Sequence, residues 1–186
     1  MIKEKTYENS DENPVWFAMS ATFGRAMKAK AFLESKSIEC FVPMKYEVVI
    51  DKKQKKQRRL VPAINNLIFT HTTKQQIQSL KATIGYLQYL TKPENGKNVP
   101  IIVPEDQMEQ FITVCNTRNE KLVYLTPDEI DLKEGTPVKI IGGPLIGIKG
   151  IYTKIKGARN KRLVISIPGT LAITAEIEAN MIEVLS

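Results

Sequence analysis

VKIIGGPLIGIKG, the stretch from Val138 to Gly150, decides how the C-terminal part of this chain folds. The β-branched residues at its start favour a half-buried strand. Gly142 and Gly143 allow a positive φ in a tight turn, and Pro144 fixes its own φ and keeps the preceding residue out of the helical region. Gly150 then marks the return into a second strand. The stretch therefore predicts the opening of a small β-barrel.

The residues around this stretch continue the same pattern of short strands. Turns at Gly157, at residues 159–161 and at Pro168-Gly169 separate them. The expected strands are Val138–Ile141, Gly150–Ile155, Leu163–Ile167, Leu171–Glu176 and Ile182–Leu185. Five short strands with nearly regular turn signals predict an all-β barrel over residues 133–186.

Residues 14–115 alternate between strand and helix patterns and predict a separate domain. Apolar residues at helical spacing predict helices from 22 or 24 to 36, from 73 to 85, and from 104 to 115. Strands are expected at Pro14–Ser20, Ile38–Val42, Tyr46–Ile50, Leu60–Val61, Asn66–His71 and Tyr86–Leu90, with a loop over residues 92–99. This order predicts an α+β domain, with helices packed on a mixed or antiparallel sheet. A polar leader at 1–13, which lacks the apolar segment of a secretory signal, and a polar linker at 116–132 complete the organisation.

The composition excludes several classes of protein. A chain of 186 residues holds one large domain or two small ones, and its 42% of hydrophobic residues permits packed cores. No apolar run approaches the roughly 20 residues of a membrane helix, so we expect a cytoplasmic protein without a membrane partner. Cys40 and Cys115 lack metal-ligand spacing, and we interpret them as small buried hydrophobes. His71 is the single histidine, and no nucleophile stands with a base, so we expect neither a metal nor a cofactor, and no enzyme activity.

Almost all of the net charge of +7 lies in one octet, KKQKKQRR, from residue 52 to residue 59. Its six cations, which leave +1 for the rest of the chain, are Lys52, Lys53, Lys55, Lys56, Arg58 and Arg59. One interpretation is a flexible basic loop or hairpin tip that follows a DNA or RNA backbone, with a salt slope of about −4 on a single strand. The other is a solvated tip. The octet contains no aromatic residue, so base stacking there is not expected.

The order of these features resembles the NusG family of transcription elongation factors. The marks in the first domain are Trp16-Phe17 in the first strand, Gly24 before the helix, the run Cys40–Pro43, and Pro100–Pro104 before the third helix. In the second domain, Gly143, Pro144, Lys149 and Gly150 resemble the KOW motif. Ile64–Phe69 (INNLIF) is similar to the UpxY antiterminators of capsular polysaccharide operons, which with RfaH are specialised paralogues of the family.

The resemblance implies that the first domain docks on the clamp helices of RNA polymerase and suppresses pausing or termination. On this chain the apolar depression that docks maps to Ala18, Asn66 and Ile68, with Tyr86 or Tyr89 at its rim. Strand alternation places Ile68 with Asn66, and Leu67 with Phe69 on the opposite face. We expect Leu67 and Phe69 in the core and Ile68 at the docking surface; the alternative is that Ile68 faces the core.

The resemblance also implies contacts with nucleic acid and with a partner of the barrel. The first helix of the specialised paralogues meets the non-template DNA strand, here near Arg25, Lys28 and Lys36; the alternative is a solvated helix face. Nascent RNA is the other nucleic acid considered. The barrel is expected to bind a ribosomal protein or a termination factor. His71-Thr72-Thr73 is interpreted as a strand end and a helix cap. The alternative function is that of a KOW-type RNA-binding or ribosome-associated protein.

Overall fold

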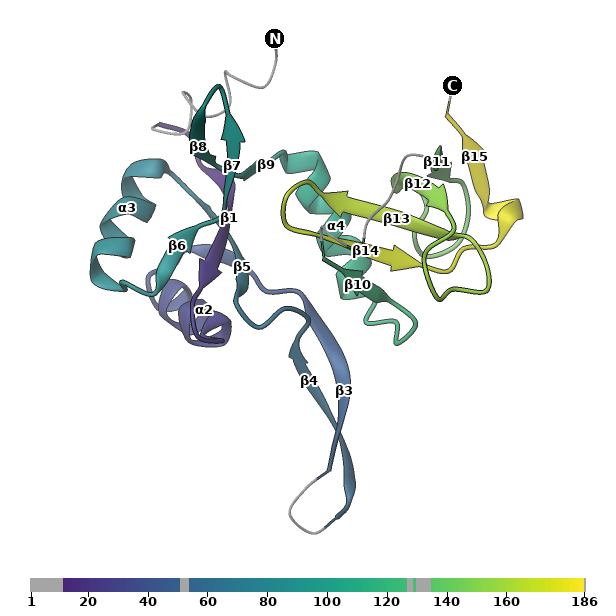
Figure 1. Ribbon diagram of the computed structural model, residues 1–186, viewed down its shortest axis with the longest axis horizontal. Helices are drawn as coiled ribbons and strands as arrows, with labels where there is room; N and C mark the ends of the chain where they lie inside the picture. Colours follow the sequence, from purple (N-terminus) through teal and green to yellow (C-terminus); the bar gives the residue numbers. More distant parts are fainter. Residues whose placement is uncertain (1–11, 51–53, 127–128, 130–134, 186) are drawn as a thin grey trace. The chain divides into compact units, whose positions relative to one another are not determined.

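The computed structural model describes residues 12–50, 54–126, 129 and 135–185 (Figure 1). The chain divides into two compact units, an N-terminal unit of residues 1–105 and a C-terminal unit of residues 106–186. The three predicted helices are present, as α2 (Ala26–Ser35), α3 (Lys74–Thr83) and α4 (Glu105–Asn116). All of α4 after its first residue belongs to the C-terminal unit. None of the helices is long and apolar enough to cross a membrane within the part of the chain that is described.

The N-terminal unit is built on an antiparallel five-stranded sheet. Its central strand, β1, pairs with β5 on one side and with β6 and β9 on the other, and β2 extends the sheet beyond β5. These strands are β1 (Val15–Ala21), β2 (Glu39–Phe41), β5 (Leu67–Thr72), β6 (Leu87–Tyr89) and β9 (Ile102–Val103). The long antiparallel register between β1 and β5 fixes which side chains share a face.

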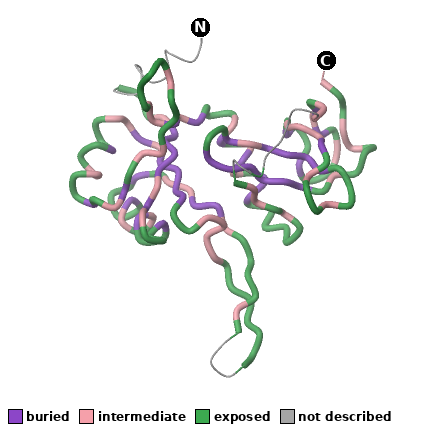
Figure 2. The backbone as a smooth tube through the Cα atoms, viewed as in Figure 1, coloured by how far each residue is buried: buried purple, intermediate pink, exposed green. Residues whose placement is uncertain are grey.

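One face of this sheet carries the core of the N-terminal unit. Phe17, Met19 and Ile68 are fully buried there, together with Leu33 of α2 and Ile77 of α3. Burial of such side chains is worth about 1.5–3 kcal/mol each, which holds both helices against the sheet. The buried course of β1 through this unit is visible in Figure 2.

The expectation that Ile68 faces outward is wrong, whereas Leu67 and Phe69 are buried, as expected. Ile68 lies opposite Met19, on the face that α2 and α3 cover, whereas Phe69 lies opposite Ala18 on the other face. Both sets are apolar, so the alternation in the sequence was correct but did not show which set the helices cover.

Two hairpins lie in the N-terminal unit, where the sequence predicts a loop or hairpin tip at residues 52–59 and a loop at residues 92–99. The basic octet runs into a strand, because β3 (Met44–Ile50) pairs along its whole length with β4 (Lys56–Pro62). Lys52 and Lys53 lie outside the described residues. The second hairpin joins β7 (Thr91–Glu94) to β8 (Lys97–Pro100) through the Asn95-Gly96 turn. Both residues of that turn have positive φ, as an Asn-Gly hairpin requires.

The C-terminal unit contains a six-stranded antiparallel sheet in the order β10-β14-β13-β12-β11-β15. Its strands are β10 (Val123–Leu125), β11 (Thr136–Ile140), β12 (Lys149–Thr153), β13 (Arg162–Ile167), β14 (Leu171–Ala175) and β15 (Ile182–Val184). The five strands predicted here are present. β10 is an addition, because its residues fall within the predicted linker but pair with β14. A short 3₁₀ helix, Ala179–Met181, precedes β15.

Candidate nucleic-acid interface

An exposed aromatic residue stands at the turn between β1 and α2. The side chain of Phe23 is 86% exposed, and its backbone φ is +60°, in the left-handed region that a phenylalanine rarely adopts. Gly24 follows with a φ of +66°. A strained, exposed aromatic residue held at a turn is a mark of functional sites, since the rest of the fold must stabilise it.

One cation lies over the ring of Phe23, and two lie over the ring of Tyr86. The guanidinium carbon of Arg25 lies 5.2 Å from the ring centre of Phe23 and 5.1 Å from that of Tyr86, and the Nζ of Lys28 lies 5.8 Å from the ring centre of Tyr86. Arg25 is also the N-cap residue of α2, and no side chain caps the helix there. An uncapped helix N-terminus favours an anion, because its N–H groups point outward. We call Phe23, Arg25, Lys28 and Tyr86 the stacking patch.

Backbone hydrogen bonds fix the stacking patch to the end of β1. The N–H of Ala21 donates to the carbonyl oxygen of Asn66 at 2.7 Å, and the N–H of Thr22 donates to that of Tyr86 at 2.9 Å. Asn66, which is exposed, also donates from its side chain to the hydroxyl of Ser20 at 3.4 Å. These bonds bring the turn, Asn66 and Tyr86 together at one edge of the unit.

The predicted site residues therefore group differently from the expectation. Asn66 and Tyr86, which were assigned with Ala18 and Ile68 to polymerase docking, lie beside the turn that carries Arg25 and Phe23. Ala18 and Ile68 are both buried, on opposite faces of the sheet. Lys36 follows the end of α2, about 16 Å along the helix from Arg25, and its Nζ lies 5.9 Å from the ring centre of Phe32.

Phe23 was missed in the sequence because no pattern distinguishes it from a core residue. It follows a strand directly and precedes an amphipathic helix, where an apolar residue is usually buried. A signal was nevertheless present: the sequence Phe23-Gly24-Arg25 places a large apolar residue beside the glycine of a turn.

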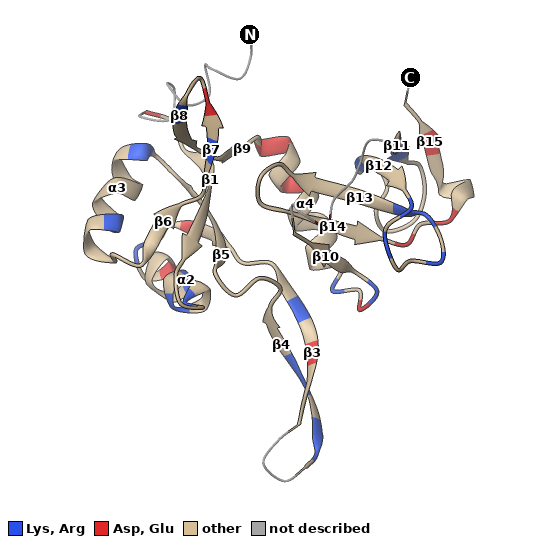
Figure 3. Cartoon of the chain, viewed as in Figure 1, with Lys and Arg blue, Asp and Glu red and all other residues tan. Residues whose placement is uncertain are grey.

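The stacking patch has the chemistry of a site for single-stranded nucleic acid. Bases stack on exposed rings whatever their sequence, while nearby cations hold the phosphates. Figure 3 shows the Lys and Arg positions of α2 on the fold. The patch lies in the N-terminal unit, as do the cations of the ribbon formed by β3 and β4.

Phe23→Ala is expected to weaken binding of a single-stranded dT oligonucleotide at least fivefold, because loss of one base stack removes about 1–3 kcal/mol. Fluorescence anisotropy with labelled dT₁₂ measures the affinity. The matched control is Ile146→Ala, which also truncates an exposed apolar side chain, 66% exposed, but in the C-terminal unit. Equal affinities for wild type and Phe23→Ala would contradict a stacking role.

A second cluster surrounds the single histidine. The ring of His71 stacks on that of Trp16 with ring centres 5.0 Å apart, and its Nδ1 lies 2.8 Å from a carboxylate oxygen of Glu39. Glu105 accepts a hydrogen bond from the indole N–H of Trp16 at 3.1 Å. Thr73 caps α3 by accepting from the N–H of Gln76, so the interpretation of His71–Thr73 as a strand end and a helix cap is confirmed.

The cysteines are free thiols with raised pKa values. Burial raises the pKa of Cys40 to about 11 and that of Cys115 to about 12, so both stay protonated at neutral pH. Among the described residues no cluster of histidine, cysteine and acidic side chains could hold a metal ion.

The residues that resemble the KOW motif lie in the turn after β11 and at the start of β12. Gly143 has the expected positive φ of +79°. Lys149 and Gly150 open β12, where the N–H of Lys149 donates to the side chain of Gln110 at 2.8 Å. Pro144 is exposed in the intervening turn.

Comparison with known proteins adds a family match. The model of the NusG family, described as transcription termination factor nusG, matches residues 14–112. A solved structure described as "Domain interaction in Thermotoga maritima NusG" is similar at 14% sequence identity and a TM-score of 0.46, covering 94% of this chain and 98% of that chain. No curated protein matches the sequence.

Proposed function

Because the chain belongs to the NusG family of transcription factors, we propose that it is an antitermination factor that acts on RNA polymerase at specific operons. Family membership implies an interaction with RNA polymerase and a role in transcription elongation or termination. The observation that carries the proposal beyond the family is the stacking patch, since a single strand of DNA is exposed in a transcribing polymerase. Its exposed ring and cations fit that strand better than a duplex.

The operon class follows from the resemblance of Ile64–Phe69 to the UpxY antiterminators. We assign the chain to that specialised group, with capsular polysaccharide operons as its targets and RfaH as a more distant paralogue. Asn65 and Asn66 lie next to the stacking patch: the Cβ of Asn65 is 3.9 Å from the position that a Cβ on Gly24 would take. This placement supports a link between the distinguishing residues and the nucleic-acid site.

Docking on the polymerase clamp helices is assigned to the sheet face that carries Ala18. Trp16, Ala18 and Phe69 make this face apolar, although all three are buried, and Ser20 lies at its end, half-exposed. An apolar face of this kind suits a pair of helices once it is uncovered. Ile68 is not part of this docking surface, because it lies in the core under α2 and α3.

The C-terminal unit is proposed to be a KOW-type barrel that recruits a ribosomal protein or a termination factor. The turn between β11 and β12 supports this role, because it exposes two large apolar side chains, Ile141 at 51% and Ile146 at 66%. Exposed apolar residues close together mark interaction surfaces.

Transcription in vitro with the cognate polymerase tests the function. One template carries a terminator alone, and the second carries the untranslated leader of a capsular operon upstream of that terminator. Read-through that rises only on the second template is the expected result. Equal effects on both templates would make this protein a general elongation factor. No effect, with no polymerase retained on the immobilised chain, would overturn the proposal and favour the RNA-binding alternative.

Ser20→Arg is expected to weaken retention of polymerase at least tenfold, because it places a charge at the end of the proposed docking face and charged residues are excluded from interface cores. Ser79→Arg, on the exposed side of α3, is the matched control. Retention of polymerase is measured without nucleic acid, so that the nearby stacking patch does not contribute. Equal retention by the two variants would contradict the assignment of this face.

A further inference from the structure

Two strands of the N-terminal unit, β3 (Met44–Ile50) and β4 (Lys56–Pro62), form a ribbon that pairs with no other strand among the described residues. The ribbon extends away from the sheet of this unit (Figure 1), and most of both strands is exposed (Figure 2). An isolated two-stranded ribbon buries little surface of its own. Both of its faces are therefore open to a partner.

The two faces of the ribbon differ in character. Strand alternation and the register between β3 and β4 place the even-numbered residues of both strands on one face and the odd-numbered residues on the other. The even-numbered face carries four exposed apolar side chains, which we call the apolar stripe: Tyr46, Val48, Ile50 and Leu60. The opposite face is mainly polar, and its apolar members, Val49 and Val61, are half-buried.

The apolar stripe gathers much of the exposed apolar surface of this protein. Val48 and Ile50 are each 62% exposed, and Tyr46 and Leu60 are each 39% exposed. Among the described residues ten large apolar side chains are exposed, and four of them belong to the stripe. Single exposed apolar residues are ordinary, but several on one face mark an interaction surface, because water contact with apolar area is unfavourable.

Two cations border the apolar stripe on its own face. Lys56 lies opposite Ile50, and Arg58 lies opposite Val48. The guanidinium carbon of Arg58 is 4.2 Å from the ring centre of Tyr46, so its charge is held against the stripe. Within the described part of the ribbon, residues 44–50 and 54–62, Glu47 is the one acid, and it belongs to the opposite face. A partner of the stripe therefore needs acidic groups beside its apolar surface.

Two other occupants fit this combination less well. A second copy stacked on the stripe would bring Lys56 and Arg58 of both copies into one interface, and like charges across an interface are unfavourable. A nucleic acid contacts cations through its phosphates but offers little apolar surface to cover Val48 and Ile50. A protein surface that is apolar at its centre and acidic at its rim satisfies both the stripe and the cations.

We infer that the apolar stripe binds an amphipathic helix of a protein partner, with carboxylates of that helix beside Lys56 and Arg58. The two strands of the ribbon lie about 4.8 Å apart, so one helix, about 10 Å across, covers both. The stripe spans about 13 Å along β3 from Tyr46 to Ile50, and the apolar positions i, i+4 and i+7 of a helix span about 10.5 Å. This site is distinct from the stacking patch and from the sheet face that carries Ala18, and it does not depend on polymerase.

The test measures binding of two labelled helical peptides to the full-length protein by fluorescence anisotropy. Both peptides carry leucines at i, i+3, i+4 and i+7 spacing; the acidic peptide has glutamates beside the leucines, and the basic peptide has lysines there. The wild type is expected to bind the acidic peptide at least tenfold more tightly than the basic one at about 0.1 M salt. Lys56→Gln with Arg58→Gln is expected to reduce this preference to about threefold or less.

A second pair of variants tests the apolar contact. Val48→Thr with Ile50→Thr is expected to weaken the acidic peptide at least tenfold, because it makes two apolar contact residues polar, while the β-branched side chains still favour the strand. The matched control is Ile141→Thr with Ile146→Thr, which changes side chains of similar exposure, 51% and 66%, in the C-terminal unit and is expected to retain the affinity.

Three outcomes would overturn the inference. The first is an acidic peptide that does not bind, or that binds the Val48→Thr, Ile50→Thr variant as tightly as the wild type. The second is a DNA duplex that this variant binds at least tenfold more weakly than the wild type, which would assign the stripe to nucleic acid. The third is self-association of the wild type in sedimentation that the same variant abolishes, which would make a second copy the occupant.

Discussion

Gly150→Ala is expected to destabilise the C-terminal unit by about 3 kcal/mol, toward the upper end of what overpacking causes. A Cβ at this position would lie 2.6 Å from the carbonyl oxygen of Val164 and 2.9 Å from the Cδ1 of Leu163. The carbonyl belongs to β13, which pairs with β12 through Ile151 and Val164. The strand cannot move away without loss of that pairing, so relief by a small shift is not available.

Hydrogen exchange is the measurement for Gly150→Ala, because it reports each unit separately, whereas a single unfolding curve of a two-unit chain is not two-state. Amides of β13, Arg162–Ile167, are expected to exchange about a hundredfold faster in the variant, while those of β1 and β5 are unchanged. Gly85→Ala is the matched control, because nothing lies within 4 Å of the added Cβ. Unchanged protection of β13 would show that the two strands separate easily and would contradict the prediction.

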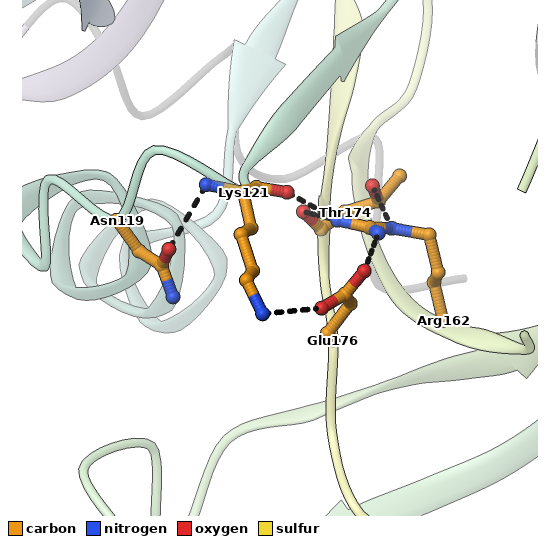
Figure 4. Close-up of polar contacts among 5 residues, drawn as sticks. All are labelled: Asn119, Lys121, Arg162, Thr174 and Glu176. Carbon is orange, nitrogen blue, oxygen red and sulfur yellow. Dashed lines mark hydrogen bonds and ion pairs between the residues drawn. The ribbon is translucent and has the colours of Figure 1, made fainter.

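Arg162→Met is expected to destabilise the same unit by about 2–3 kcal/mol. Arg162 is 6% exposed, and all three nitrogens of its guanidinium donate hydrogen bonds (Figure 4). It donates to the hydroxyl of Thr174 at 2.8 Å, to the carboxylate of Glu176 at 2.9 Å and to the carbonyl oxygen of Lys121. Methionine fills part of the volume but leaves the buried hydroxyl and the Lys121 carbonyl without this donor, and an unsatisfied buried group is costly.

The hydrogen bond from Arg162 to the carbonyl oxygen of Lys121 holds the segment before β10 to β13 and β14.

Urea unfolding followed by the far-ultraviolet signal, with hydrogen exchange of the β10 amides, measures the effect of Arg162→Met. The control is Arg159→Met, at an exposed arginine three residues before Arg162, which is expected to alter the free energy of unfolding by less than about 0.5 kcal/mol. Similar stabilities for the two variants would show that water replaces the lost donor.

Glu176 makes the stability of this cluster depend on pH. The pKa of Glu176 is held below its usual value of 4.5, first by the hydrogen bond from Lys121 and also by the charge of Arg162. A lowered pKa in the folded state stabilises the fold above the unfolded pKa, and this contribution is lost as the pH falls through the folded value. Glu176→Gln is therefore expected to flatten the loss of stability below about pH 4.5.

The sequence by itself determined the type and order of most elements in this protein. Local patterns were sufficient for the three helices and for five of the six strands of the C-terminal unit, because periodicity and turn residues act over a few neighbouring positions. The same local logic predicted a helix cap at Thr72 or Thr73 and a positive φ at Gly142 or Gly143, and the structure has them at Thr73 and Gly143. It also located the basic octet, whose charge is a property of composition alone.

Tertiary structure decided which surfaces these elements present. Leu67, Ile68 and Phe69 are all apolar, so only the packing of α2 and α3 shows that Ile68 is the one under the helices. The pairing of β4 with β3 placed residues 56–59, predicted as part of a loop or hairpin tip, in a strand and brought Tyr46 to Arg58. Phe23, Arg25 and Tyr86 meet because hydrogen bonds join the end of β1 to residues more than 40 positions away, and no local pattern encodes a contact at that separation.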